Sequence, residues 1–189
     1  MDQPFSHQLV ALLPRLRRFA RGLAGSREAA DDVVQAACER ALMRRDQFEP
    51  GSRLDSWMYR IVQNLWIDQL RKDRRGEIGI DPADLAEFPG GDSAAEAEGK
   101  LYLAEVRRAI ARLPEDHREV LLLVSVEGVA YKQAAEILDL PIGTVMSRLS
   151  RARLALGHEL EKDWRQRAGS VGTPRSFATN ATNVVRIKR

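Results

Sequence analysis

The chain has 189 residues, 44% of them hydrophobic and 30% charged, and a formal net charge of +3. This length accommodates one ordinary domain or two small ones, and the apolar fraction excludes a chain that is disordered throughout. The single cysteine, Cys38, excludes an internal disulfide, and with only three scattered histidines we expect neither a metal site nor a cofactor. No apolar run approaches the ~18 residues of a membrane span and the N-terminus lacks a signal-peptide pattern, so we expect a cytoplasmic protein without membrane insertion.

Residues 1–75 read as a small helical domain, with no sustained period-two alternation. Ser26 is a suitable N-cap for the second helix, and Ser52 could cap the third. Pro14 lies inside the first helical pattern and predicts a kink or a break there, because proline removes a backbone donor. Helices are expected over 5–23, 26–45 and 52–74.

An acidic joint separates this block from a second one. Residues 76–99 carry seven acidic residues, no basic ones, five glycines and two prolines, which is typical of a flexible linker. In the second block, 100–168, Pro114 and Pro141 each lie where a helix could start. Helices are expected there over 100–112, 115–126, 130–138 and 142–157, and the tail 169–189 is predicted to be disordered. The predicted fold is therefore all-α, with two small helical domains joined by a flexible acidic linker.

The segment 131–156 has the layout of a helix-turn-helix. A short helix (KQAAEILD) and a longer one (GTVMSRLSRARLAL) flank a three-residue turn, which lets the second helix enter a DNA major groove. On a helical wheel with 100° per residue, the buried stripe of the second helix consists of Val145, Leu149, Ala152 and Leu156. The opposite face offers small serines and Arg151 for base edges, and flanking arginines for phosphates. The candidate DNA contacts are Thr144, Met146, Ser147, Arg148, Ser150, Arg151 and Arg153. A helical hairpin with merely solvated arginines is the alternative.

A basic strip lines the third helix, opposite a core stripe of Leu54, Met58, Ile61, Val62 and Leu65. Its members are Arg53, Ser56, Arg60, Gln63, Ile67, Arg71 and Arg74, with Asn64 at the border. Trp57 flanks it on one edge, and Tyr59 and Trp66 on the other. A basic strip bordered by aromatics is typical of proteins that hold unstacked single-stranded nucleic acid. The alternative is that these aromatics are simply the edge of the core.

The second helix presents a different outer face. Its inner stripe is Ala30, Val33, Val34, Ala37 and Ala41. The outer face combines acidic, amide and apolar side chains, namely Asp32, Gln35, Glu39, Leu42 and Met43. This mixture indicates a protein-docking face, with a merely solvated face as the alternative.

Three blocks in order resemble conserved regions 2 and 4 of extracytoplasmic-function sigma factors. They are ADDVVQAACERAL, LDSWMYRIVQNLWIDQLRKDRR and LPEDHREVLLLVSVEGVAYKQAAEILDLPIGTVMSRLSRARLAL. The resemblance covers about residues 8–75 and 100–160. It implies a non-catalytic transcription initiation factor that binds core RNA polymerase and promoter DNA. It also implies an anti-sigma factor covering both modules, and we expect the free protein to be a monomer.

The same resemblance assigns roles to the three faces. The outer face of the second helix, around Asp32 and Gln35, docks on the clamp helices of the largest polymerase subunit. Helix 142–157 reads the minus-35 element, although Met146 departs from the Lys or Arg common at that position, so the family's minus-35 sequence does not transfer. The linker threads toward the RNA path. The third helix recognises and opens the minus-10 element through Arg53, Tyr59, Arg60, Gln63, Asn64, Ile67, Arg71 and Arg74.

Two other functions compete with this interpretation. A stand-alone helix-turn-helix repressor or activator explains the second block but leaves the basic strip and the docking face unused. A metal-dependent nuclease would have to converge Asp31, Asp32, Asp55, Asp68 and Asp73. On the third helix Asp55 and Asp68 point in different directions, and no His or Lys lies nearby to act as a base. The sequence therefore favours a sigma factor and predicts no enzyme.

Overall fold

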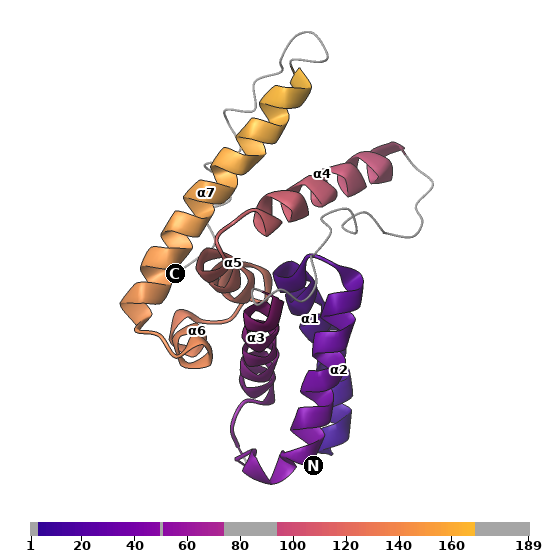
Figure 1. Cartoon of the computed structure of the whole chain (residues 1–189), viewed down its shortest axis with the longest axis vertical. Coiled ribbons are helices and arrows are strands. Elements are labelled where there is room, and N and C mark those ends of the chain that lie inside the picture. The colour runs from indigo at the N-terminus through magenta and orange to yellow at the C-terminus, as the bar shows by residue number, and fades with distance from the viewer. Residues whose placement is uncertain (1–3, 50, 74–93, 169–189) are drawn as a thin grey trace.

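The computed structural model describes residues 4–49, 51–73 and 94–168. The first module consists of α1 (Phe5–Ala24), α2 (Arg27–Met43), a 3₁₀ turn η1 (Arg45–Gln47) and α3 (Leu54–Asp73). The second module consists of α4 (Ala94–Ala111), α5 (Glu115–Leu121), a π-helical segment η3 (Leu122–Val126), α6 (Tyr131–Leu138) and α7 (Ile142–Ala168). The described residues form helices and turns and no strand, so the predicted all-α fold is confirmed (Figure 1).

The predicted helix signals of the first module had mixed outcomes. Ser26 caps α2, because its hydroxyl accepts a hydrogen bond from the Ala29 amide at 3.2 Å. The predicted cap at Ser52 is wrong: this hydroxyl donates to the Glu49 carbonyl, and α3 begins two residues later. Of the kink or break predicted at Pro14, the break does not occur. α1 continues through this residue, which lies on its exposed side, where water can satisfy the carbonyl that proline leaves without a donor.

Two helices of the second module are longer than expected. α4 begins at residue 94 instead of 100, and α7 continues to residue 168 instead of ending near 157. An ion-pair cluster accounts for the extension of α7, since the Arg112 guanidinium at the end of α4 pairs with Glu159 at 3.0 Å and with Asp163. The predicted disorder of the tail 169–189, and residues 76–93 of the predicted linker, lie outside the described residues.

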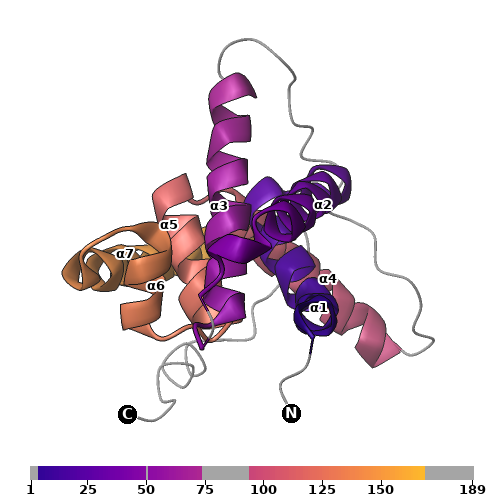
Figure 2. The same cartoon turned by 90° about the horizontal axis from the view of Figure 1, so that it is seen from below.

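The two modules pack against each other, which the sequence did not predict. Figure 2 shows α3 between the α1–α2 pair on one side and α5 and α6 on the other. Buried apolar residues of both modules belong to one continuous core. The backbone of α1 comes so close to η3 that a Cβ on Gly22 would lie 2.5 Å from a Leu122 methyl. Nearby, Arg118 of α5 donates to the Leu23 carbonyl at 2.9 Å. We call this arrangement the closed form.

Replacing Gly22 by leucine should force the modules apart. The new side chain has no room beside buried Leu122, and overpacking a close contact of this kind costs about 1–3 kcal/mol. Small-angle scattering should report a larger radius of gyration for Gly22→Leu than for wild type. Gly99→Leu is the matched control, because nothing lies within 4 Å of a Cβ at that position in α4. An unchanged radius in both variants would contradict a close contact at Gly22.

Candidate nucleic-acid and polymerase interfaces

The helix-turn-helix forms as predicted from the sequence. α6 ends at Asp139, which adopts the left-handed conformation (φ 53°), and the first turn of α7 is closed by the Thr144 amide bonding to the Pro141 carbonyl. Val145, Leu149 and Ala152 are buried on the inner side of α7, and Leu156 is half-buried. Thr144 is partly buried. The other side of the helix is exposed at Met146, Ser147, Ser150 and Arg151.

The arginines of α7 differ in their surroundings. Arg151 is exposed and forms no ion pair with any other described residue. Arg148 is held between two carboxylates of α5, with Asp116 at 3.5 Å and Glu119 at 3.4 Å. Arg153 is exposed, and its guanidinium lies 3.4 Å from the Ser125 hydroxyl. In the closed form Arg151 is thus the arginine of this set most available to an incoming base edge.

The basic strip on α3 is only partly exposed. Arg60 and Asn64 are exposed, and Ile67 is half-buried. Arg71 is exposed and lies 3.7 Å from Asp68. Arg74 lies outside the described residues.

The beginning of the strip is tied to an acid in the first turn of α3. Arg53 forms a bidentate pair with Asp55, with its shorter contact at 2.7 Å. These bonds lower the pKa of the Asp55 carboxyl. Arg53 is therefore already oriented by a carboxylate before any nucleic acid binds.

The edge of the strip that faces the second module is buried. Tyr59 has 0% exposure, and its hydroxyl donates to the Glu127 carboxylate at 2.7 Å. Gln63 donates to the Glu119 carboxylate at 2.9 Å. A helical wheel of α3 alone places Gln63 toward solvent and Tyr59 at the edge of the strip, because it contains no information about a second module packing against that face. Trp66 is 3% exposed, so this aromatic too is part of the core in the closed form.

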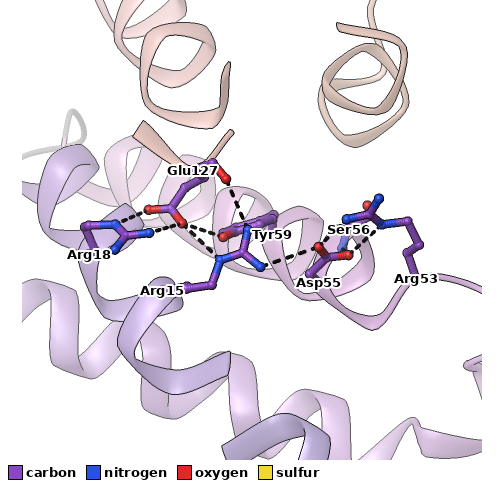
Figure 3. A network of polar contacts seen from close by, with 7 residues as sticks. All are labelled: Arg15, Arg18, Arg53, Asp55, Ser56, Tyr59 and Glu127. Carbon is purple, nitrogen blue, oxygen red and sulfur yellow. Dashed lines mark hydrogen bonds and ion pairs between the residues drawn. The ribbon is translucent and has the colours of Figure 1, made fainter. Parts of the chain in front are cut away.

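Glu127 is the centre of the contact between the modules (Figure 3). Its side chain is completely inaccessible to solvent, yet it comes from the turn that follows η3. Arg18 of α1 binds both carboxylate oxygens, at 2.7 and 2.8 Å. Arg15 lies 3.5 Å from the same carboxylate and also donates to the Glu127 carbonyl at 3.2 Å. With the Tyr59 hydroxyl, the first module therefore supplies every donor to this carboxylate among the described residues.

The surroundings shift the pKa values of these groups in directions that fit their bonding. The hydrogen bond to Glu127 raises the pKa of Arg18. Burial, and then the hydrogen bond to Glu127, raise the pKa of Tyr59, so its hydroxyl stays a donor. Burial raises the pKa of Glu119, and the hydrogen bond from Gln63 opposes that shift.

Sequence reasoning missed Arg15, Arg18, Glu119 and Glu127. One signal was available: Glu127 directly follows the apolar run LLLVSV and precedes a glycine. A single carboxylate at the end of such a run is a candidate for burial, and buried carboxylates need cationic partners. The sequence could not indicate that those partners lie more than a hundred residues away, in α1.

The outer face of α2 is exposed as predicted. All members of the inner stripe are buried, whereas Leu42 and Met43 are 54% and 83% exposed. Asp32 is exposed, and the amide of Gln35 donates to Glu39 at 3.0 Å. Two large apolar side chains next to acidic and amide groups make this surface suitable for a protein partner.

Comparison with known proteins identifies the family. Residues 9–76 match the family model for Sigma-70 region 2, and residues 103–156 match that for Sigma-70, region 4. The ECF RNA polymerase sigma factor EcfG of Rhodopseudomonas palustris is 38% identical over 168 residues, which cover 89% of this chain and 91% of the relative. The chain belongs to the ECF family of RNA polymerase sigma factors.

Further comparisons agree with this assignment. The ECF RNA polymerase sigma-E factor of Escherichia coli is 34% identical, over 69% of this chain and 73% of the relative. The sigma factor RpoE of Bartonella quintana, solved in complex with the anti-sigma factor NepR, superposes with a TM-score of 0.72 at 33% identity, over 83% of this chain and 96% of that one. The first module corresponds to region 2 and the second to region 4, so the sigma-factor family accounts for both modules, whereas a stand-alone helix-turn-helix regulator accounts for one.

None of the helices among the described residues is long and apolar enough to cross a membrane. No three His, Cys, Asp or Glu side chains gather there in a way that could hold a metal ion.

Removing the Tyr59 hydroxyl should destabilise the closed form. Tyr59→Phe deletes one hydrogen bond to a buried carboxylate, which is worth about 2 kcal/mol. Urea unfolding should show this decrease in the free energy of unfolding. Tyr131→Phe, at an exposed position of α6, is the control and should change it by less than about 0.5 kcal/mol. Equal effects of the two variants would show that the hydroxyl bond contributes nothing.

Proposed function

We propose that this sigma factor uses three separate helix faces for three separate contacts. The exposed side of α7 reads the minus-35 element, the basic strip of α3 recognises and opens the minus-10 element, and the outer face of α2 docks on core RNA polymerase. The observation that carries the proposal is that each face has exposed side chains with the chemistry its partner requires. A serine-lined face with an unpaired arginine suits a major groove, and an arginine strip suits a melted strand.

The division of labour follows from the residues. Arg151 contacts a base edge, while Thr144, Arg148 and Arg153 contact phosphates that position the helix. Met146 is 52% exposed beside them and presents an apolar group to the groove, where a thymine methyl is a suitable partner. On α3, exposed Arg60, Asn64 and Arg71 line the path of the single strand.

The protein's partners follow from the same surfaces. Core RNA polymerase supplies the catalytic chemistry, and this chain supplies recognition and part of the energy of strand opening without being an enzyme itself. The free protein is a monomer acting on cytoplasmic DNA. An anti-sigma factor restrains it, which the solved complex of the Bartonella quintana relative with NepR supports.

Run-off transcription tests the proposed polymerase contact. Core polymerase with this protein should start at discrete sites on a promoter library, and the double variant Asp32→Ala/Gln35→Ala should lose these products. The variant removes polar groups from an exposed face, so the fold should be unaffected. Glu161→Ala, which removes an equal charge from the far end of α7, is the control. Products that persist at wild-type level in the double variant would contradict docking through this face.

Substituting Arg151 tests the minus-35 reader. Arg151→Ala should cost about 1–3 kcal/mol of binding at one promoter position and little at the others, because a base contact specifies while a phosphate contact does not. Transcription competition across single-base promoter variants measures this profile. Arg165→Ala, on the same helix beyond the proposed reading face, should leave the profile unchanged. Equal losses at every position for Arg151→Ala would assign that arginine to the phosphate backbone instead.

A further inference from the structure

The contact at Glu127 is an anion-binding site built by one module and occupied by the other. Arg15, Arg18 and Tyr59 all belong to the first module, and together they surround a carboxylate of the second. Two guanidinium groups and a phenol hydroxyl form the donor set that also binds a phosphate group, since arginine matches carboxylates and phosphates with the same bidentate geometry. A site of this composition is not specific for a glutamate.

The location of the site connects it to nucleic acid. Tyr59 is on α3, and the next residue, Arg60, is exposed on the strip that we propose to hold the opened strand. Gln63, one turn further along, is likewise held by a carboxylate of the second module, Glu119. In the closed form two carboxylates therefore occupy the edge of a surface whose proposed ligand is a polyanion.

The closed form cannot read both promoter elements at once. Gln63 of α3 and Arg148 of α7 contact the same carboxylate, that of Glu119, at 2.9 and 3.4 Å. The surfaces proposed for the minus-10 and minus-35 elements thus meet within one side chain, whereas a single turn of duplex DNA is already ~34 Å long. Under the proposed function, on which this step rests, the modules must separate. Glu127 then leaves the site.

We propose that Arg15, Arg18 and Tyr59 bind a backbone phosphate of the opened promoter strand in the place that Glu127 occupies in the closed form. Glu127 acts as an internal competitor for this site. Exchange of one anion for another keeps both part-exposed arginines paired after the modules separate. The affinity of the free protein for a single strand is then reduced by the fraction of molecules that are closed.

Single-strand binding by the free full-length protein tests the exchange. A dye-labelled 20-nucleotide mixed-sequence single strand is titrated at low salt and followed by fluorescence anisotropy. Glu127→Gln keeps the shape of the side chain but removes its charge, so it should tighten binding about tenfold by releasing the site. Adding Arg18→Ala to this variant should abolish most of the gain and lower the slope of log K against log salt by about 0.7, the value for one phosphate contact on a single strand.

Arg17 provides the matched control. It is an exposed arginine of the same helix and pairs with Asp31 at 3.4 Å, away from Glu127. In the Glu127→Gln background, Arg17→Ala should reduce affinity much less than Arg18→Ala. Equal effects would reduce the role of Arg18 to general positive charge and overturn the proposal. It would also be overturned if Glu127→Gln bound the single strand no more tightly than wild type.

A disulfide between α1 and η3, which would lock the closed form, tests whether closure blocks single-strand binding when Glu127 is intact. A Cβ at Gly22 would lie 3.2 Å from Leu122 Cγ, so cysteines at the two positions are within disulfide reach. In a Cys38→Ser background, oxidised Gly22→Cys/Leu122→Cys should bind the single strand more weakly than the same protein after reduction. Equal binding in the two states, or failure of the disulfide to form, would contradict the exchange.

The outcome separates this inference from the proposed function. Promoter-dependent run-off by wild type, with no difference between Arg17→Ala and Arg18→Ala in strand binding, would remove the anion site and leave the promoter contacts standing. If only Arg18→Ala loses affinity for the single strand, and wild type gives no run-off products, the anion site stands and the proposed promoter recognition is contradicted.

Discussion

A buried carboxylate is the polar centre of the contact that holds the two modules of this sigma factor together. Removing a charged side chain from water is costly, and Glu127 is stable inside the protein only because two arginines and a tyrosine replace its hydration. Its donors come from α1 and α3, whereas its backbone belongs to the turn after η3. The π-helical segment that precedes it ends with the Glu127 amide bonded to the Leu122 carbonyl. The position of α7 relative to α3 depends on this contact and on the apolar core around Gly22 and Leu122.

The contact between the modules also affects how the protein could bind a promoter under the proposed function. Each module carries its own proposed DNA-reading helix, so each can keep its internal packing while the distance between them changes. The closed form hides Tyr59 and Gln63 but leaves Arg60, Asn64 and Arg151 exposed. Under the proposed function, one face of α3 serves two mutually exclusive contacts, with the second module or with nucleic acid, and the balance between them determines how readily the free protein binds DNA.

Periodicity and family resemblance predicted most of the fold and the chemistry of the exposed faces. The buried stripe of α7 and that of α2 follow from 3.6-residue spacing, because within one helix the apolar side is the buried side. Contacts between distant segments are not encoded in that spacing. Tyr59 and Gln63 were therefore predicted as free to contact DNA when they are covered, and Arg15 and Arg18 were missed because their partner lies in the other module. The part of α7 past residue 157 likewise has a distant partner, Arg112, which directly follows α4.

The distance between the modules tests the central claim, that they are closed in the free protein and separate on the promoter. Fluorophores attached at exposed Val10 of α1 and exposed Glu161 of α7, in a Cys38→Ser background, report this distance by energy transfer. If the free protein is closed, it should show a single narrow distribution of this distance, and the distribution should change markedly when core polymerase and promoter DNA are added together. An unchanged distance in the promoter complex would contradict the central claim.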